Sequence, residues 1–511
     1  MERCVSGSQS HILCDAAIVT DADTAVQASM VLVRRMEIFT NMEYKIIPFQ
    51  TVEERSKTDA VKAEELLSQA MEGFHKKLVV LDDDPTGVQT VHDVSVYTDW
   101  EEASISSGFE EKESMFFILT NSRSFSAEET TKAHQDIAER VKKVAGEKNQ
   151  DFMIISRGDS TLRGHYPLET QILAEGLGSV DGEIICPFFP EGGRYTMDNI
   201  HYVKEQENLV PAGMTEFAKD KTFGYKSSDL TEYVEEKTEG KYKKQDCITI
   251  SLEELNALDV QGIKEKLMEA KEMAKIIVNA VSYADLKVFC AALVLAMKDG
   301  KRYMARTAAA FTKVMGRVSD QPLLGRTQLE GETKNGGIVL IGSHVKKTTD
   351  QLNCLKELDG QADFMEFQVN AVFEENGLEK EVERTVKAAE EKILSGRTVV
   401  IYTSRQLLAP ENMTPEEKLQ ISVKISNAVT SIIGKLSVKP KFIIAKGGIT
   451  SSDVGTKALQ VKKARVMGQV KKGIPVWMTG KESKFPGMPY IIFPGNVGEV
   501  STLKEIVEEL I

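Results

Sequence analysis

The residues best suited to chemistry follow a short apolar segment. Three consecutive carboxylates, Asp82, Asp83 and Asp84, come directly after the four branched apolar residues at 78–81. Such a run is typical of a strand buried on both faces, and a proline and a glycine just beyond it indicate where the strand stops. Because ligands bind at the carboxyl ends of strands in open α/β sheets, the carboxylates predict a site for a small polar molecule. Like charges this close repel one another, so an arginine, a metal or a substrate proton should lie beside them.

Guanidinium groups and further polar side chains follow later apolar segments in the same way. The segments 115–119, 152–155 and 184–186 each predict a strand that ends in a charged or glycine-rich loop. The candidate residues in these loops are Arg123, Arg157, Asp159, Arg163 and Arg194. Arginine binds carboxylates through two parallel hydrogen bonds, and carboxylates accept hydrogen bonds from sugar hydroxyls or hold a metal, so the set suits a polyhydroxy acid. The alternative, in which these arginines and aspartates only pair with one another as structural ion pairs, stays open.

The C-terminal part of the chain places small residues at the ends of its predicted strands. Gly447 and Gly448 follow an apolar segment, and threonine and serine residues come shortly after them. A helix that begins near Ser452 would direct its unpaired N–H groups and the positive end of its dipole at a phosphate. Ser343 and Gly495 follow two other predicted strands and would lie beside this turn in a parallel sheet. The turn is a candidate nucleotide site, although each glycine can also serve backbone geometry alone.

The elements that must position these residues alternate between apolar segments and amphipathic stretches. This alternation predicts an α/β protein with two α/β domains, each with a largely parallel sheet flanked by helices. A chain of 511 residues also exceeds what a single hydrophobic core supports. The predicted divisions are 1–41, a disordered extension or a wrongly assigned start; 42–77, a helical lead-in; 78–300, the first domain; 301–336, a connecting helix and linker; and 337–511, the second domain.

Composition excludes several classes of function. The net charge of −13, from 64 lysines and arginines against 77 aspartates and glutamates, argues against nucleic acid as the main ligand. The six cysteines are widely separated, with no metal-ligand spacing and no disulfide framework, which predicts a reduced, cytoplasmic protein. The longest apolar run, at 288–297, is far short of the roughly 20 residues that span a bilayer, so no membrane partner is expected. Assembly into a homo-oligomer stays open.

Acidic and basic side chains in one domain and glycine turns in the other suggest phosphoryl transfer, in which positioning and charge neutralisation dominate. No GxxxxGK[ST] motif and no protein-kinase catalytic loop is present, so a kinase would be of another type. Two alternatives stay open. Asp82, Asp84 and Thr86 fit the DxDx[TV] pattern of haloacid-dehalogenase-like phosphatases, with Asp82 as the covalent nucleophile. A non-catalytic sensor of sugar acids would keep the same fold without turnover.

The motifs taken together resemble those of the four-carbon acid sugar kinases. They run in order from about residue 78 to 507 and read DDDPTG (82–87), TNSRS (120–124), SRGDSTLRG (156–164), PFFPEGGR (187–194), HYV (201–203), RTAAAF (306–311), KGGITSSD (446–453) and FPGNVG (493–498). There are two departures from many relatives. This chain has Asp84 and Pro85 where they have a shorter acidic motif, and Ile449 where they have glutamate. Substrate identity within the family therefore does not transfer.

The resemblance implies a transferase that uses ATP and Mg²⁺ to phosphorylate the terminal hydroxyl of threonate, erythronate or a 3-oxo-tetronate. It implies that the N-terminal domain binds the acid sugar and that the C-terminal domain binds ATP. The residues implied for the acid sugar are Asp83, Asp84, Arg123, Asp159, Arg163 and Arg194, and one of Asp83, Asp84 and Asp159 would orient the hydroxyl. Those implied for ATP are Ser343, Gly447, Gly448, Ile449, Thr450 and Gly495, while the metal ligands stay unassigned.

Overall fold

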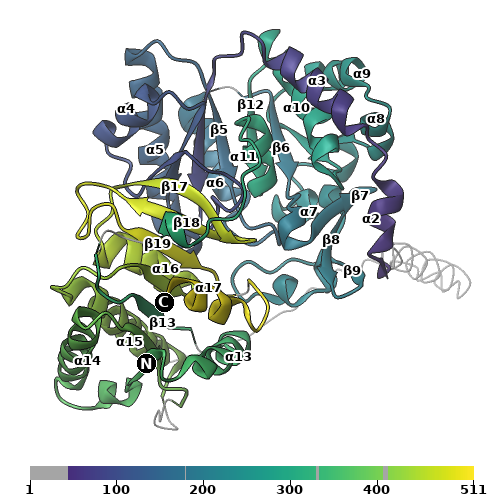
Figure 1. Cartoon of the computed structure of the whole chain (residues 1–511). Helices are drawn as coiled ribbons and strands as arrows, with labels where there is room; N and C mark the ends of the chain where they lie inside the picture. The colour runs from purple at the N-terminus through teal and green to yellow at the C-terminus, as the bar shows by residue number, and fades with distance from the viewer. Residues whose placement is uncertain (1–43, 179, 330–332, 344, 407–412, 496) are drawn as a thin grey trace, which may run out of the picture. The chain divides into compact units, whose positions relative to one another are not determined.

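A long sheet organises the chain (Figure 1). Its first eight strands run in the order β10-β11-β6-β12-β5-β2-β4-β3. The computed structural model describes residues 44–178, 180–329, 333–343, 345–406, 413–495 and 497–511, so the predicted extension at 1–41 lies outside the described residues. The bounds are β2 (Lys77–Asp82), β3 (Ser95–Tyr97), β4 (Met115–Leu119), β5 (Phe152–Arg157), β6 (Gly182–Cys186), β10 (Ile248–Ile250), β11 (Ala274–Val278) and β12 (Tyr303–Thr307). All neighbouring pairs among these eight strands are parallel, so their carboxyl ends lie along one edge.

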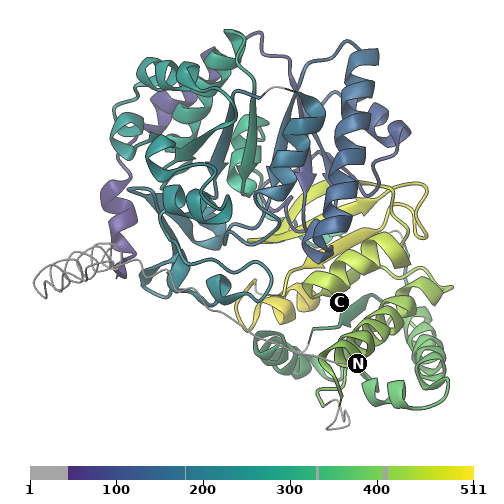
Figure 2. The ribbon, with the colours of Figure 1, turned by 180° about the vertical axis from the view of Figure 1, so that it is seen from behind.

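Helices cover both faces of this part of the sheet, and alternate residues of each strand face different helices. Leu78 and Val80 of β2 join a core with α3 (Ala60–Met71), α10 (Tyr283–Lys298) and α11 (Ala309–Met315). Val79 and Leu81 face α4 (Glu102–Glu110), α5 (Ala127–Glu147) and α6 (Leu168–Leu177) on the other side. Figure 2 shows α5 and α6, in blue, in front of the strands. The uninterrupted apolar run of β2 is thus explained by burial on both faces.

The boundary predicted near residue 300 differs from the structure. β12 lies between β5 and β6, and α11 follows it, although residues 301–336 are predicted as a connecting helix and linker. β12 carries the sequence Tyr-Met-Ala-Arg-Thr, whose arginine interrupts the apolar pattern that predicts buried strands. The interrupting residue, Arg306, is nevertheless buried.

A small antiparallel sheet follows the predicted loop at 187–194. Its order is β1-β9-β8-β7, with β1 (Ile47–Pro48), β7 (Arg194–Met197), β8 (Ile200–Glu205) and β9 (Asn208–Pro211). The short hairpin strand predicted at 201–203 is part of β8. Thr196 of β7 bridges to Ala280, so this sheet is attached beyond the end of β11.

The second α/β part has five parallel strands in the order β19-β16-β13-β15-β14. They are β13 (Ile338–Ile341), β14 (Ala362–Phe367), β15 (Thr398–Thr403), β16 (Ile443–Lys446) and β19 (Pro489–Phe493). One face packs on α13 (Lys346–Leu355) and α17 (Thr502–Leu510), and the other packs on α14 (Gly377–Leu394) and α15 (Pro415–Lys435). The predicted fold class, with two α/β parts built on largely parallel strands, is confirmed.

The two parts share hydrogen-bonded strands. β17 (Lys463–Lys471) pairs antiparallel with β3 on one side and with β18 (Ile474–Thr479) on the other. β18 in turn pairs with β19, so one sheet of 15 strands runs through residues 77–493. Among the described residues, no helix combines the length and the apolar character that crossing a membrane requires.

A buried ion pair in this sheet gives a test of the fold. Lys275 of β11 stands opposite Glu183 of β6, and its Nζ donates a hydrogen bond to Glu183 Oε2. Both side chains are almost fully buried. We expect Lys275→Met to lower the free energy of unfolding by ~3–5 kcal/mol, because it leaves a carboxylate buried without its partner.

The Lys275→Met/Glu183→Leu double variant should recover most of that loss, because no unpaired charge remains. Urea unfolding measures both variants. Lys243→Met, which breaks the exposed pair with Glu235, is the control and should cost at most about 1 kcal/mol. A double variant no more stable than Lys275→Met would contradict this account of the pair.

Candidate functional site

Polar residues from distant parts of the chain meet at the carboxyl edge of the first part of the sheet. In the register of the strands, Asp82 of β2 stands opposite Arg157 of β5, and Arg157 stands opposite Thr307 of β12. The loop after β4 carries Arg123, and the loop after β5 carries Asp159 and Arg163. The structure therefore brings the carboxylates and guanidinium groups predicted from the sequence into one cluster.

Arg123 binds two of the three consecutive carboxylates. Its Nη2 lies 2.7 Å from Asp83 Oδ1 and its Nε lies 3.2 Å from Oδ2, which is a bidentate pair. Its Nη1 is 3.4 Å from Asp84 Oδ2. Burial tends to raise the pKa of Asp83, but the charges of Arg123, Arg157 and Arg306 outweigh it and hold that pKa below its usual value. Asp83 is thus a buried anion that fixes Arg123.

Arg157 fixes the turn that contains the carboxylates. Its Nη2 donates to Asp82 Oδ1 and also to the backbone oxygen of Asp84, at 2.9 Å. Burial raises the pKa of Asp82 to about 7 although the Arg157 charge opposes that rise. Gly87 makes this packing feasible, because a Cβ there would lie 2.1 Å from Arg157 Nε.

A second buried pair lies behind the first, and the sequence analysis does not identify it. Arg306 Nη1 donates to Glu169 Oε2 at 2.9 Å and to Ser156 Oγ at 3.0 Å, and Ser122 Oγ donates to the other oxygen of Glu169 at 2.6 Å. Arg306 belongs to the RTAAAF motif, which was a usable signal. Glu169 lies within α6 and carries no signal in the sequence. This pair supports the loops that carry Arg123 and Asp159.

The loop after β5 is held by ion pairs and by tyrosines. Arg163 Nε donates to Asp159 Oδ2 at 2.7 Å, and Thr161 Oγ1 donates to the same oxygen. Burial tends to raise the pKa of Asp159, but the charges of Arg123 and Arg163 lower it strongly. The hydroxyl of Tyr225 donates to the backbone oxygen of Thr161 at 2.8 Å. Asp159 is therefore ionised and oriented.

His201 supports the same loop from the small sheet. Its Nε2 lies 2.8 Å from the backbone oxygen of Ser160, and its Nδ1 lies 3.0 Å from Thr196 Oγ1. Burial lowers the pKa of His201 to about 4, so its ring is neutral near pH 7. A neutral ring that donates from Nε2 and accepts at Nδ1 satisfies both contacts.

Two charged groups of the cluster are not neutralised as the others are. Asp82, Asp83, Asp159 and Glu169 each have a close arginine partner. The Asp84 side chain is more exposed, at 16%, and the arginine nitrogen nearest to its carboxylate is 3.4 Å away. Arg194 lies 5.7 Å from the Phe217 ring centroid, its Nε is buried without an acceptor, and within the described residues it has no carboxylate partner. One carboxylate and one guanidinium group thus remain for a ligand.

The glycine turns of the second part also meet, because β13, β16 and β19 are adjacent and parallel. A Cβ on Gly342 would lie 2.2 Å from Thr450 Oγ1, and one on Gly447 would lie 3.2 Å from Ser343 Cβ. A Cβ on Gly495 would lie 4.0 Å from the backbone nitrogen of Gly448. Gly447 has φ +128°, a conformation that favours glycine. The predicted nucleotide-binding residues therefore share one edge.

The helix after this turn begins earlier than predicted. α16 (Gly448–Asp453) starts at Gly448 and continues into a π-helical turn, Val454–Ala458, whereas the sequence predicts a start near Ser452. Ser452 and Thr450 are buried inside it, so the hydroxyls do not cap the helix. Gly447 takes the capping position with its backbone alone. Ile449 is 66% exposed, so its side chain points away from the core.

Lys446, at the end of β16, is a further site residue that the sequence analysis does not identify. Its Nζ donates to the backbone oxygens of Pro494 and Gly495 at 2.6 and 3.0 Å and lies 4.2 Å from the Phe493 ring centroid. Burial, together with the charge of Lys347, lowers the pKa of Lys446 to about 7. Its position before the paired glycines was the available signal.

The residues present fit a nucleotide better than a metal cage. The glycine turn lets a ligand approach the backbone closely, and Lys446 adds a buried amino group beside it. Over the part of the chain that the structure describes, no three His, Cys, Asp or Glu side chains are grouped to hold a metal. Mg²⁺ that arrives with a nucleotide needs only one or two carboxylates besides phosphate and water.

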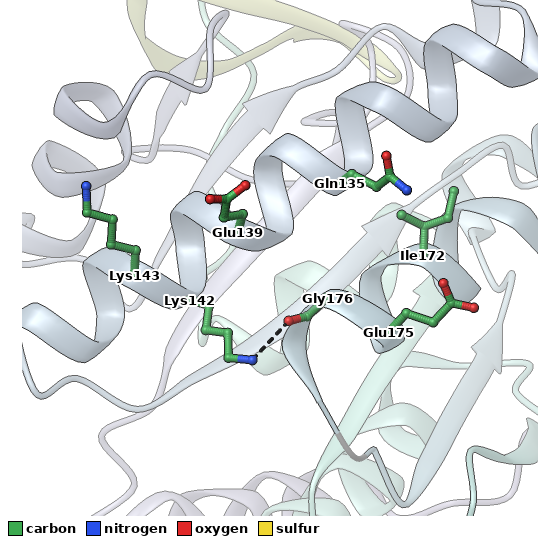
Figure 3. Close-up of a pocket in the computed structure, with 7 residues that line it drawn as sticks. All are labelled: Gln135, Glu139, Lys142, Lys143, Ile172, Glu175 and Gly176. Carbon is green, nitrogen blue, oxygen red and sulfur yellow. Dashed lines mark hydrogen bonds between the residues drawn. The ribbon is translucent and has the colours of Figure 1, made fainter.

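A hollow on the outer surface lies away from these strand ends. It lies between α5 and α6 and is lined by Gln135, Glu139, Lys142, Lys143, Ile172, Glu175 and Gly176 (Figure 3). The Lys142 side chain crosses toward α6 and donates to the backbone oxygen of Gly176 at 3.2 Å. These residues lie on the surfaces of the two helices, and none of the residues described above lines the hollow. It is not the candidate site.

Comparison with known families agrees with this division of chemistry. Residues 78–315 match the family described as "Sugar-binding N-terminal domain", and residues 338–503 match "Nucleotide-binding C-terminal domain". The chain belongs to the four-carbon acid sugar kinase family. The acidic and arginine-rich strand ends lie in the sugar-binding domain of this family, and the glycine turns lie in its nucleotide-binding domain.

Solved structures show the same fold for other chains. HI1011 of Haemophilus influenzae is 18% identical, with a TM-score of 0.55 over 84% of this chain and 99% of that one. A Salmonella typhimurium LT2 protein, provisionally named a tRNA synthase, is 16% identical, with a TM-score of 0.59 over 85% of this chain and 98% of that one. No curated protein matches the sequence. At these identities the likeness establishes the fold that the family shares.

The buried His201 predicts a pH dependence of stability. Its folded pKa of about 4 lies below the usual 6.5, so the unfolded chain binds a proton that the folded chain does not as the pH falls from 6.5 to 4. We expect this group to remove about 2 kcal/mol of stability between pH 7 and pH 5. In His201→Gln that loss should be absent, as urea unfolding at the two pH values would measure.

His75→Gln serves as the control, because His75 is exposed. This variant should show the same pH dependence as the unaltered protein. An unchanged pH dependence in His201→Gln would show that His201 is already charged in the folded state.

Proposed function

We propose that the protein is an ATP-dependent kinase that phosphorylates the terminal hydroxyl of a four-carbon acid sugar, such as threonate, erythronate or a 3-oxo-tetronate. The observation that carries this proposal is the incomplete neutralisation of the acidic cluster. Four carboxylates have close arginine partners, while Asp84 and Arg194 are left. An acceptor for a hydroxyl and a donor pair for a carboxylate are the complements of a hydroxy acid.

Arg194 suits the carboxylate of the substrate. Burial lowers the pKa of Arg194 and the neighbouring Arg163 charge adds to that, while the Asp159 carboxylate opposes it, so an anion bound directly to Arg194 is favoured. Arg163 and Arg194 both lie over the Phe217 ring, at 5.0 and 5.7 Å from its centroid. Both are thereby held at one side of the site.

Asp84 suits the reacting hydroxyl. Its Oδ1 accepts hydrogen bonds from the backbone nitrogen and the hydroxyl of Thr86, at 2.8 and 2.5 Å, which fixes the orientation of the carboxylate. Its Oδ2 has only the 3.4 Å contact with Arg123. In the reaction, the hydroxyl oxygen bonds to the γ-phosphorus, the bond from that phosphorus to ADP breaks, and the hydroxyl proton passes to Asp84. Asp83 acts by holding Arg123.

The nucleotide would lie against the glycine turns of Gly342, Gly447 and Gly495, which share one edge of the sheet. Lys446 holds the turn at Pro494 and Gly495 in place. Mg²⁺ bound to the phosphates would neutralise charge that develops on them.

The two alternatives make different demands on the same residues. A phosphatase nucleophile must be accessible, but the Asp82 side chain is 1% exposed and its Oδ1 is bound by Arg157. A sensor would bind the same acid without turnover, and only an activity measurement separates it from a kinase.

The direct test measures ATP consumption with Mg²⁺ in the presence of D- and L-threonate, D- and L-erythronate and 3-oxo-tetronates. Phosphate release from the phosphorylated acids is followed in parallel. We expect ADP to form with one of these acids. Acid binding without ADP formation would establish the sensor. Phosphate release from a phosphorylated acid without ADP formation would indicate a phosphatase with Asp82 as its nucleophile.

Asp84→Asn tests the role of the exposed carboxylate. We expect kcat to fall by about 100- to 10,000-fold, because the amide cannot accept the hydroxyl proton. The affinity for ATP should stay unchanged, since the glycine turns are untouched. Steady-state kinetics and calorimetric titration with ATP measure the two quantities.

Asp246→Asn is the matched control, because Asp246 is an exposed aspartate of the same domain. It should retain full activity. A parallel loss of turnover and ATP affinity in Asp84→Asn would contradict the division of roles between the two domains.

A further inference from the structure

An arginine at the end of β15 has no place in the residues assigned so far. β15 pairs in parallel with β13, so the residues after the two strands are neighbours. Arg405 lies two residues beyond β15, and its Nη1 donates to the backbone oxygen of Ser343 at 2.6 Å. Ser343 in turn packs against Gly447. Arg405 is therefore one hydrogen bond away from the glycine turns.

The rest of this guanidinium group has no acceptor. Its Nε and Nη2 are both buried without a hydrogen-bond partner, and within the described ranges Arg405 has no ion pair. Burial lowers the pKa of Arg405, opposed only by Tyr402 and Glu366. Other arginines of this domain are paired: Arg384 with Glu381 and Arg397 with Asp363. Arg405 is therefore a partly buried cation with no ion-pair partner among the described residues, although the Glu366 carboxylate acts on its pKa.

Such an arrangement is costly unless a ligand completes it. Buried donors without acceptors are rare in folded proteins, and a buried charge is ordinarily paired. Hydrogen bonds to Ser343 cannot satisfy the other two nitrogens, which point along the other edge of a rigid fork. The missing partner is therefore an acceptor that carries negative charge.

We propose that Arg405 binds the phosphate groups of the nucleotide. The inference rests on the proposed function, in which this domain binds ATP, and it adds a residue outside the glycine turns. Phosphate is favoured over the base or ribose because a guanidinium fork matches two phosphate oxygens. Lys446, at the adjacent glycine turn, is also buried and donates only to backbone oxygens, so no protein carboxylate described in the structure competes with an anion there.

Arg405 Nε and Nη2 are shielded from solvent, so nucleotide binding requires the groups that cover them to move. The hydrogen bond to the Ser343 oxygen then links the position of that turn to the position of the guanidinium group. A phosphate bound by Arg405 would in this way also affect the position of Ser343, which packs against Gly447.

The test compares ATP, ADP and adenosine by calorimetric titration of the full chain. We expect Arg405→Gln to lower the affinity for ATP and for ADP by about 10- to 100-fold. The affinity for adenosine should fall by less than about threefold, because only the phosphates lose a charged partner. Arg405→Lys keeps the charge but loses the fork, and should fall between the two. Arg384→Gln removes an arginine of the same domain that is paired with Glu381, and should bind all three ligands as the unaltered protein does.

The possible results separate this inference from the proposed function. Unchanged ATP affinity in Arg405→Gln, or an equal loss for adenosine and ATP, overturns the phosphate contact while the proposed function stands. No binding of any nucleotide by the unaltered protein overturns both. Should Arg405→Gln fail to fold, the ratio of ATP to adenosine affinity in Arg405→Lys decides, and an unchanged ratio overturns the contact.

Discussion

Buried pairs of arginine and carboxylate at the carboxyl edge of β2, β4, β5 and β12 are the interaction on which the acidic site depends. Arg157 with Asp82 and Arg306 with Glu169 join residues more than 70 positions apart in the chain. Each charge loses its hydration on burial, and removing one partner leaves the other without compensation. The loops after these strands are therefore fixed by electrostatics as much as by packing.

The pairing of arginines with carboxylates also determines which charged groups remain available to a ligand. Three consecutive aspartates lie at the carboxyl end of β2, yet each has a different environment. Asp82 is held by Arg157, Asp83 is held by the fork of Arg123, and Asp84 is oriented by Thr86. Pairing within the protein thus preorganises the site before any ligand arrives, which reduces the cost of orientation during reaction.

The strand ends of the second domain differ in charge from those of the first. Its strand ends carry glycine turns and the cations Lys446 and Arg405, which donate to backbone oxygens of their neighbours. Most charges of the first domain's cluster are balanced by internal ion pairs, whereas Lys446 and Arg405 have no ion-pair partner among the described residues. The proposed transfer of a phosphoryl group from a nucleotide on the second domain to a hydroxyl held by the first would use both arrangements.

The sequence by itself determined the fold class, the strands at 78–81 and 115–119 and the motifs at their ends, because burial on both faces and strand-end turns leave local patterns. It did not identify β12, since Arg306 interrupts the apolar run and is buried only because Glu169 lies opposite it. It could not separate Asp82, Asp83 and Asp84 either. Their differences come from arginines 40 to 75 residues away, and only the tertiary structure decides which distant charge each carboxylate meets.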